Sequence, residues 1–118
     1  MIKNYNTINK DLSLSHALEY LSKAENKCLI VLDKNKLVIG TLTDGDIRRS
    51  LIKSKDLNNK VGNICNKKFL YFKNDVSKSK IYETFLKNKT PLIPVLKNRK
   101  IVKVYFLEEI LNNKRSKL

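Results

Sequence analysis

Residues Gly40 to Leu51, GTLTDGDIRRSL, hold two glycines, two threonines and two aspartates, followed by an arginine pair. The apolar residues at the start of this stretch and before it are rich in β-branched side chains, which favours a strand. DGDI suits the start of a helix, because acidic side chains favour the N-terminal end of the helix dipole. A strand that runs directly into a helix places free backbone N–H groups at the junction, where an anion can bind. From the residues alone, three roles are open: an acidic catalytic cluster, a ligand-binding turn or an ordinary helix start.

The stretch closes a unit that occurs twice in the chain. Residues from Asp11 onward match those from Asp75 onward at a constant offset, with one residue lost in the turn between the two apolar runs. Each copy has a serine, apolar residues at helical spacing, two short apolar runs separated by a polar turn, and a second helical stretch. The matched pairs include Ser13 with Ser77, Leu21 with Phe85, Leu29 with Ile93, Val31 with Val95, Leu42 with Tyr105, Asp46 with Glu109 and Ile47 with Ile110.

Each copy is therefore predicted to fold in the order helix, strand, strand, helix. Ser13 and Ser77 are expected to cap the first helices, because a hydroxyl can accept a hydrogen bond from the first-turn amides. A short extended segment precedes each copy, near Thr7 and near Phe69, and the polar connector between the copies ends in a short helical turn. Because a unit this short does not bury a core alone, we expect the two copies to pack against each other.

Composition places the chain among globular proteins. Its 118 residues, 42% of them hydrophobic, can bury a core without metals or disulfides. No apolar run reaches the roughly 18 residues of a membrane helix, and the first residues lack the apolar core of a signal peptide, so we expect a cytoplasmic protein. The formal net charge of +14 invites a nucleic-acid-binding interpretation. The lysines are spread along the whole chain without a motif or an aromatic platform, which disfavours it.

Other reactive residues give no catalytic or metal site. Cys28 and Cys65 have no CxxC partner and no clustered histidine, so they are expected to be small buried apolar residues. His16 has no nucleophile or metal-ligand partner at a useful spacing and is expected at the surface. Asp44 and Asp46 stand beside two arginines with no third carboxylate nearby, which disfavours acid–base catalysis and Mg²⁺ binding.

A duplicated α-β-β-α unit whose second strand runs into G-x-x-T-x-x-D resembles the CBS domain pair, or Bateman module. In the first copy the pattern is VIGTLTDGDI, and in the second it is VKVYFLEEI. The resemblance implies a mixed α/β (α+β) fold of tandem CBS repeats packed as a pseudo-twofold intramolecular pair. Repeat 1 would span residues 1–56, the connector residues 57–68 and repeat 2 residues 69–118.

The longer string TDGDIRR is similar to the CBS modules of bacterial sugar-phosphate nucleotidyltransferases and of sugar-phosphate isomerases. The second copy's VYFLEEIL is closest to CBS pairs that stand before a nucleotidyltransferase domain. This resemblance implies a non-catalytic regulatory part of such an enzyme, with the catalytic domain following it. It implies that no cofactor is required and that the ligand is AMP, ATP or another nucleotide. It also implies a homodimer formed through the CBS helices.

The resemblance also assigns roles to residues of the first copy. Thr43 would meet a phosphate and Asp46 the ribose hydroxyls, since a carboxylate only accepts hydrogen bonds and suits a diol. Physical chemistry agrees with these roles: Gly40 lets the backbone come close to a ligand, Gly45 tolerates unusual dihedral angles, and Arg48 or Arg49 can supply charge to a phosphate. An apolar slot for the base would involve Ile8 and Ile30, with Thr7 and Cys28 beside them.

The alternative is an ordinary helix start. Asp44 would then be the N-cap, Asp46 would favour the helix dipole, and the arginines would be solvated. We expect Asp44 to cap in either case.

The second copy departs from the pattern. Lys103 stands at the position of Gly40, Phe106 at that of Thr43 and Glu109 at that of Asp46, so at most one nucleotide site is expected. Besides the sensing module, two other functions are open: a structural module that dimerises a larger enzyme without a ligand, and a basic nucleic-acid-binding domain, which the scattered lysines disfavour.

Overall fold

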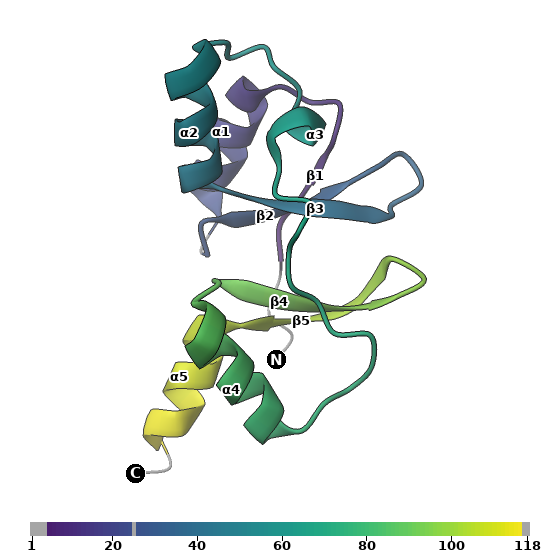
Figure 1. Ribbon diagram of the computed structural model, residues 1–118, viewed down its shortest axis with the longest axis vertical. Helices are drawn as coiled ribbons and strands as arrows, with labels where there is room; N and C mark the ends of the chain where they lie inside the picture. Colours follow the sequence, from purple (N-terminus) through teal and green to yellow (C-terminus); the bar gives the residue numbers. More distant parts are fainter. Residues whose placement is uncertain (1–4, 25, 117–118) are drawn as a thin grey trace. The chain divides into compact units, whose positions relative to one another are not determined.

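The computed structural model describes residues 5–24 and 26–116, with side chains described up to residue 112. The chain divides into two compact units, residues 1–69 (unit 1) and residues 70–118 (unit 2). Unit 1 contains β1 (Thr7–Asn9), α1 (Leu14–Lys23), β2 (Cys28–Leu32), β3 (Val38–Thr43), α2 (Asp44–Ser54) and α3 (Val61–Ile64), as Figure 1 shows. Unit 2 contains α4 (Lys78–Asn88), β4 (Leu92–Lys97), β5 (Lys100–Phe106) and α5 (Leu107–Ser116).

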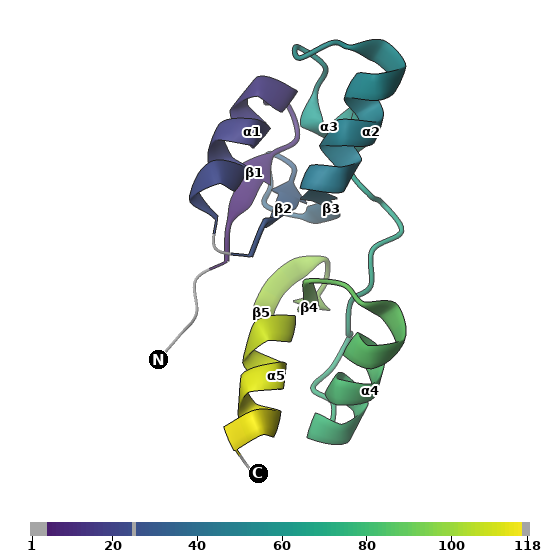
Figure 2. The ribbon, with the colours of Figure 1, turned by 90° about the vertical axis from the view of Figure 1, so that its left-hand side faces the viewer.

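Unit 1 is a three-stranded sheet covered by helices. The strand order is β1-β2-β3, with β1 parallel and β3 antiparallel to β2. Helices α1 and α2 lie side by side over the sheet (Figure 2). The apolar faces of these helices and strands form one buried core, which includes Leu14, Ala17, Leu21, Leu29, Val31, Leu42 and Ile47. The helix–strand–strand–helix prediction for the first copy is confirmed.

Unit 2 repeats this plan with a two-stranded sheet. β4 and β5 pair antiparallel, and α4 and α5 lie side by side over them (Figure 2). Ile81, Phe85 and Ile93 form its core. The single parallel bridge Phe72–Val95 takes the place of the β1–β2 pair Ile8–Val31 of unit 1.

Irregularities of the hairpins confirm the duplication. Each hairpin has a register shift at the corresponding position, between Val31 and Leu32 in unit 1 and between Val95 and Leu96 in unit 2. The predicted caps are confirmed as well: Ser13 accepts from the N–H of His16, and Ser77 accepts from that of Lys80.

The segment around α3 is fixed to unit 1 by backbone hydrogen bonds. The Leu14 N–H donates to the Asn59 carbonyl (3.0 Å), and the Val61 N–H donates to the Leu12 carbonyl (2.8 Å). Beyond α3, Asn66 forms an antiparallel bridge with Thr41 of β3. This segment therefore follows the outer edge of β3 and forms one wall beside α2.

In the part of the chain that the structure describes, no helix has the length and apolar character needed to cross a membrane.

Candidate site at the start of helix α2

Thr43 and Asp46 are locked together at the junction of β3 and α2. The Thr43 hydroxyl accepts from the Asp46 N–H (3.3 Å) and donates to Asp46 Oδ2 (3.1 Å). The Thr43 N–H donates to the same carboxylate oxygen (2.9 Å). This reciprocal capping box satisfies first-turn donors of α2 and holds the Asp46 carboxylate in one orientation.

Thr43 is thus the N-cap of α2, and the prediction that Asp44 would cap is wrong. Thr43 is the last residue of β3, paired with Cys28, and its φ of −113° and ψ of 168° are the extended values that an N-cap needs. Asp44 is already helical, and its carboxylate accepts from Arg48 Nη2 at 2.7 Å. Both of these side chains are well exposed.

Arg49, rather than Arg48, reaches the Thr43–Asp46 pair. Its Nη2 donates to Asp46 Oδ1 at 2.6 Å, so one oxygen of the carboxylate faces Thr43 and the other faces the guanidinium. The Asp46 side chain is only 15% exposed, whereas that of Arg49 is 69% exposed. The structure therefore brings together Thr43, Asp46 and Arg49, and it ties Arg48 to Asp44 instead.

The two glycines of the motif have different surroundings from those expected. A Cβ at Gly40 would lie 2.7 Å from the Asn66 carbonyl oxygen and 2.8 Å from Cys65 Sγ, so the close approach at Gly40 is made by the chain itself. Gly45 lies in the first turn of α2 without a positive φ, so its backbone does not use the freedom that glycine has there. Positive φ values occur instead at residues such as Lys55 and Lys89, which end α2 and α4.

The residues assigned to a base slot are buried in the sheet. Ile8 is 2% exposed and belongs to the core of unit 1, and Ile30 is fully buried. Ile30 pairs with Thr41 on β3, whereas Cys28 pairs with Thr43. Ile30 therefore lies farther along the sheet than the Thr43–Asp46 pair, and the base slot stays a prediction.

Both thiols near this site are kept neutral. Burial raises the pKa of Cys28 to about 12, and the Asp46 carboxylate contributes in the same direction. Burial also raises the pKa of Cys65. Because the thiolate is the reactive form, neither cysteine is set up as a nucleophile. Among the described residues, no group of three or more His, Cys, Asp or Glu side chains could hold a metal ion.

The corresponding junction of unit 2 has lost its polar pair. Phe106, opposite Leu92, is 1% exposed and fills the position of Thr43. Lys103 Nζ lies 2.8 Å from Asp75 Oδ1 and 5.5 Å from the centre of the Tyr105 ring. This junction therefore offers no hydroxyl where Thr43 offers one.

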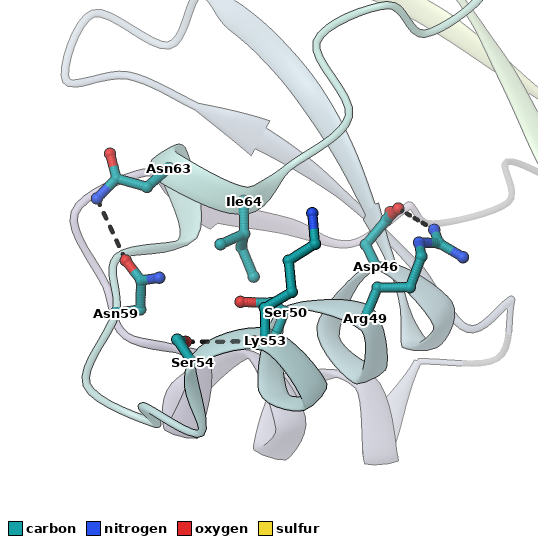
Figure 3. A pocket seen from close by; sticks show the side chains of 8 residues that line it. All are labelled: Asp46, Arg49, Ser50, Lys53, Ser54, Asn59, Asn63 and Ile64. Atoms are coloured by element: carbon teal, nitrogen blue, oxygen red, sulfur yellow. Dashed lines mark hydrogen bonds and ion pairs between the residues drawn. The ribbon is translucent and has the colours of Figure 1, made fainter.

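Sequence reasoning missed a polar groove beside the site. α2 and the segment around α3 enclose it, and its lining continues from Asp46 and Arg49 along α2 to Lys53 (Figure 3). The helical spacing of Asp46, Arg49 and Lys53 places the three side chains on one face of α2, and this pattern could have predicted one wall of the groove. The other wall comes from residues 59–64, and nothing local in the sequence places them opposite α2.

The sequence model of the CBS domain family matches residues 1–53. These residues hold β1 to β3, the Thr43–Asp46 box and nearly all of α2. Residues 1–53 are thus similar to the CBS domain. The resemblance drawn from VIGTLTDGDI is confirmed at this level.

Proteins of known function or structure are similar to this chain in sequence or in fold. Chloride channel protein CLC-f of Arabidopsis thaliana is 34% identical over 76 residues, which are 60% of this chain and 10% of that protein. The chain thus spans about a tenth of the length of this curated relative.

Two solved structures show the extent of the shared fold. A CBS-domain-containing protein from Agrobacterium tumefaciens superposes with a TM-score of 0.80 at 16% identity, covering 95% of this chain and 85% of that one. The cytosolic domain of the Mg²⁺ channel MgtE, solved in complex with ATP, superposes with a TM-score of 0.74 at 19% identity. The match covers 92% of this chain and 44% of that one. The mixed α/β CBS-pair fold predicted from the repeat is therefore confirmed.

Proposed function

We propose that this chain is a regulatory, non-catalytic CBS pair that senses a nucleotide at the Thr43–Asp46 turn. The observation that carries the proposal is the Asp46 carboxylate. Thr43 holds one of its oxygens in place, and the other oxygen accepts a hydrogen bond from the exposed Arg49 side chain. A ribose diol can replace that guanidinium, because a carboxylate accepts several hydrogen bonds. The first-turn amides of α2 would face the phosphate.

An adenine nucleotide, AMP or ATP, is the proposed ligand class. Support comes from the MgtE domain of the same fold, which was solved with ATP, and from the resemblance that assigns Thr43 to phosphate and Asp46 to ribose. Binding would shift the conformation of a larger protein, and the coupling must be reciprocal between the two sites.

A thermal-shift series tests nucleotide sensing. A ligand that binds only the native state stabilises it, by about 2.7 kcal/mol at ~100 times its Kd. We expect ATP or AMP to raise the Tm, and inorganic tripolyphosphate at equal ionic strength to do so much less. Asp46→Asn should remove the nucleotide effect, and the matched change Glu109→Gln in unit 2 should leave it. The absence of any shift with adenine, cytidine and uridine nucleotides would contradict nucleotide sensing.

We also propose that the module is cytoplasmic and regulates a sugar-phosphate nucleotidyltransferase, with a sugar-phosphate isomerase as the second context. The support is the string TDGDIRR together with VYFLEEIL in the second copy. The reading frame after Leu118 tests this directly. A glycine-rich nucleotidyltransferase loop there supports the first context, and a different domain contradicts it.

A structural dimerisation module is the second candidate. It is favoured because the polar groups of Thr43 and Asp46 already form hydrogen bonds with each other. Two exposed apolar side chains on the helices of unit 1 also favour it, Leu18 (37% exposed) and Ile52 (72%). Sedimentation analysis separates the candidates: a dimer that Ile52→Lys dissociates, in a protein that no nucleotide stabilises, supports this second function. Salt-sensitive binding to arbitrary DNA or RNA would instead favour a nucleic-acid partner.

A further inference from the structure

The groove between α2 and α3 has the size of a small-molecule site. Its volume is about 430 Å³, within the range of roughly 300–1,000 Å³ that ligand pockets occupy. Arg49, Ser50, Lys53 and Ser54 line it from α2 and its end, and Asn59, Asn63 and Ile64 line it from the α3 side, as Figure 3 shows. The groove lies within unit 1.

The charges of the groove favour an anion. At one end the Arg49 guanidinium and the Asp46 carboxylate pair at 2.6 Å and neutralise each other. Lys53 extends across the groove beside Ile64 (Figure 3). None of the ion pairs found among the described side chains involves Lys53, so its ammonium leaves the lining with a net positive charge.

Hydrogen-bond donors stand on both walls. Asn63 Nδ2 donates one hydrogen to Asn59 Oδ1 (3.3 Å), which leaves its second N–H and the Asn59 NH₂ group as donors. Ser50 adds a hydroxyl from α2. Figure 3 shows the asparagine side chains on the far side of Ile64 from the Lys53 ammonium, so the donors line both walls of the groove and do not surround the ammonium. Neutral donors on both walls together with one ammonium suit an oxyanion, which presents acceptor oxygens on several sides.

The α3 wall is held in place before any ligand binds. The Gly62 N–H donates to the Lys10 carbonyl (2.8 Å), and the Cys65 N–H donates to the Val61 carbonyl (3.0 Å). A Cβ at Gly62 would lie only 3.0 Å from Lys10 Cβ, which shows how closely this turn is packed. A fixed wall lowers the entropy cost of binding.

We propose that the α2–α3 groove is an anion site that binds the phosphate group of a small phosphate monoester. Lys53 supplies the charge, Ser50, Asn59 and Asn63 donate hydrogen bonds, and Ile64 contacts the body of the ester. The groove adjoins the Thr43–Asp46 turn and shares Asp46 and Arg49 with it, but phosphate binding at Lys53 does not require a nucleotide at the turn.

Amide NMR with inorganic phosphate as the probe tests this site. In a titration against sodium chloride of equal ionic strength, we expect saturable shifts of the Lys53 amide and of the Asn59 and Asn63 side-chain NH₂ groups. Lys53→Gln should weaken phosphate binding at least fivefold. Lys34→Gln, the same charge change in the β2–β3 turn, should leave the affinity within twofold of the unsubstituted chain.

Asn63→Asp provides a second variant that places a negative charge in the groove, and it should abolish the saturable shifts. Three outcomes would overturn the proposal: shifts that grow linearly and spread over the lysines of the whole chain, equal effects of Lys53→Gln and Lys34→Gln, or saturable shifts confined to the amides of Gly45 and Asp46. The last result would place the anion at the helix start instead of the groove.

Discussion

Gly40 offers the sharpest test of how unit 1 is built. Its position on β3 faces residues 65 and 66, which cross the outer edge of the strand. Asn66 exchanges two backbone hydrogen bonds with Thr41, at 3.1 and 2.8 Å. A methyl group at Gly40 would lie 2.7 Å from a backbone oxygen and 2.8 Å from Cys65 Sγ. Neither neighbour is the end of a long flexible side chain, so alanine forces the crossing segment away from β3.

The expected cost of Gly40→Ala follows from these contacts. Overpacking of a well-packed site costs about 1–3 kcal/mol. Weakening the two hydrogen bonds to Thr41 adds about 1 kcal/mol each, and the lower entropy of the unfolded alanine chain returns about 0.4–1 kcal/mol. The free energy of unfolding should therefore fall by about 2–4.5 kcal/mol.

Gly45→Ala is the matched control, five residues along the same motif. There the Cβ would come within 3.3 Å only of the Arg49 guanidinium, which can move, and the backbone is helical. Alanine in a helix is favoured over glycine by about 0.5–1 kcal/mol, so this variant should gain stability. Urea unfolding followed by circular dichroism measures both changes without any ligand. A stable Gly40→Ala, or a Gly45→Ala that loses as much as Gly40→Ala, would refute the assignment of Gly40 to a contact within the chain.

Three further predictions concern caps and a buried thiol. Thr43→Ala should lower the free energy of unfolding by about 1–2 kcal/mol in urea titrations, because the α2 cap is lost, whereas Thr43→Ser should stay close to the parent chain. Ser77→Ala should cost about 1 kcal/mol in the same assay, because its hydroxyl accepts from the Lys80 N–H. The thiol of Cys28 has a folded pKa raised from 9.0 to about 12, so its contribution to stability is complete below pH 9 and is lost as pH rises from 9 towards 12. Between pH 8 and pH 10 the parent should lose about 1 kcal/mol more than Cys28→Ala, measured by guanidinium unfolding at each pH; equal losses would contradict a buried neutral thiol.

The features that were predicted correctly depend on local patterns. Ser13 and Ser77 each precede apolar residues at helical spacing, and a hydroxyl at that position has few better partners than the first-turn amides. The hairpins follow from apolar runs broken by short polar turns. The duplication strengthened both, because a weak signal in one copy was repeated at the same offset in the other.

The details that sequence spacing leaves open include the cap of α2, where the prediction was wrong, and the partners of the arginines and of Gly40. Thr43 and Asp44 are both good cap residues, and the pairing of Thr43 with Cys28 decided between them by keeping Thr43 extended. Arg48 and Arg49 are both within reach of an acidic residue of the first turn. The structure pairs Arg48 with Asp44 four residues away and Arg49 with Asp46 three residues away. The contact at Gly40 comes from residues far along the chain, and no local pattern reports it.

The contact at Gly40 also changes what the departures in the second copy mean. If Gly40 serves the packing of residues 65 and 66 on β3, then Lys103 at the corresponding position is no sign of a lost ligand. Lys103 instead pairs with Asp75 and lies over the Tyr105 ring, so its side chain covers this part of β5. Phe106 is the informative change, because it buries an aromatic ring where Thr43 holds Asp46. The case for a site in one copy and not in the other therefore depends on the hydroxyl of Thr43 and the carboxylate that it orients, and not on the glycine of the motif.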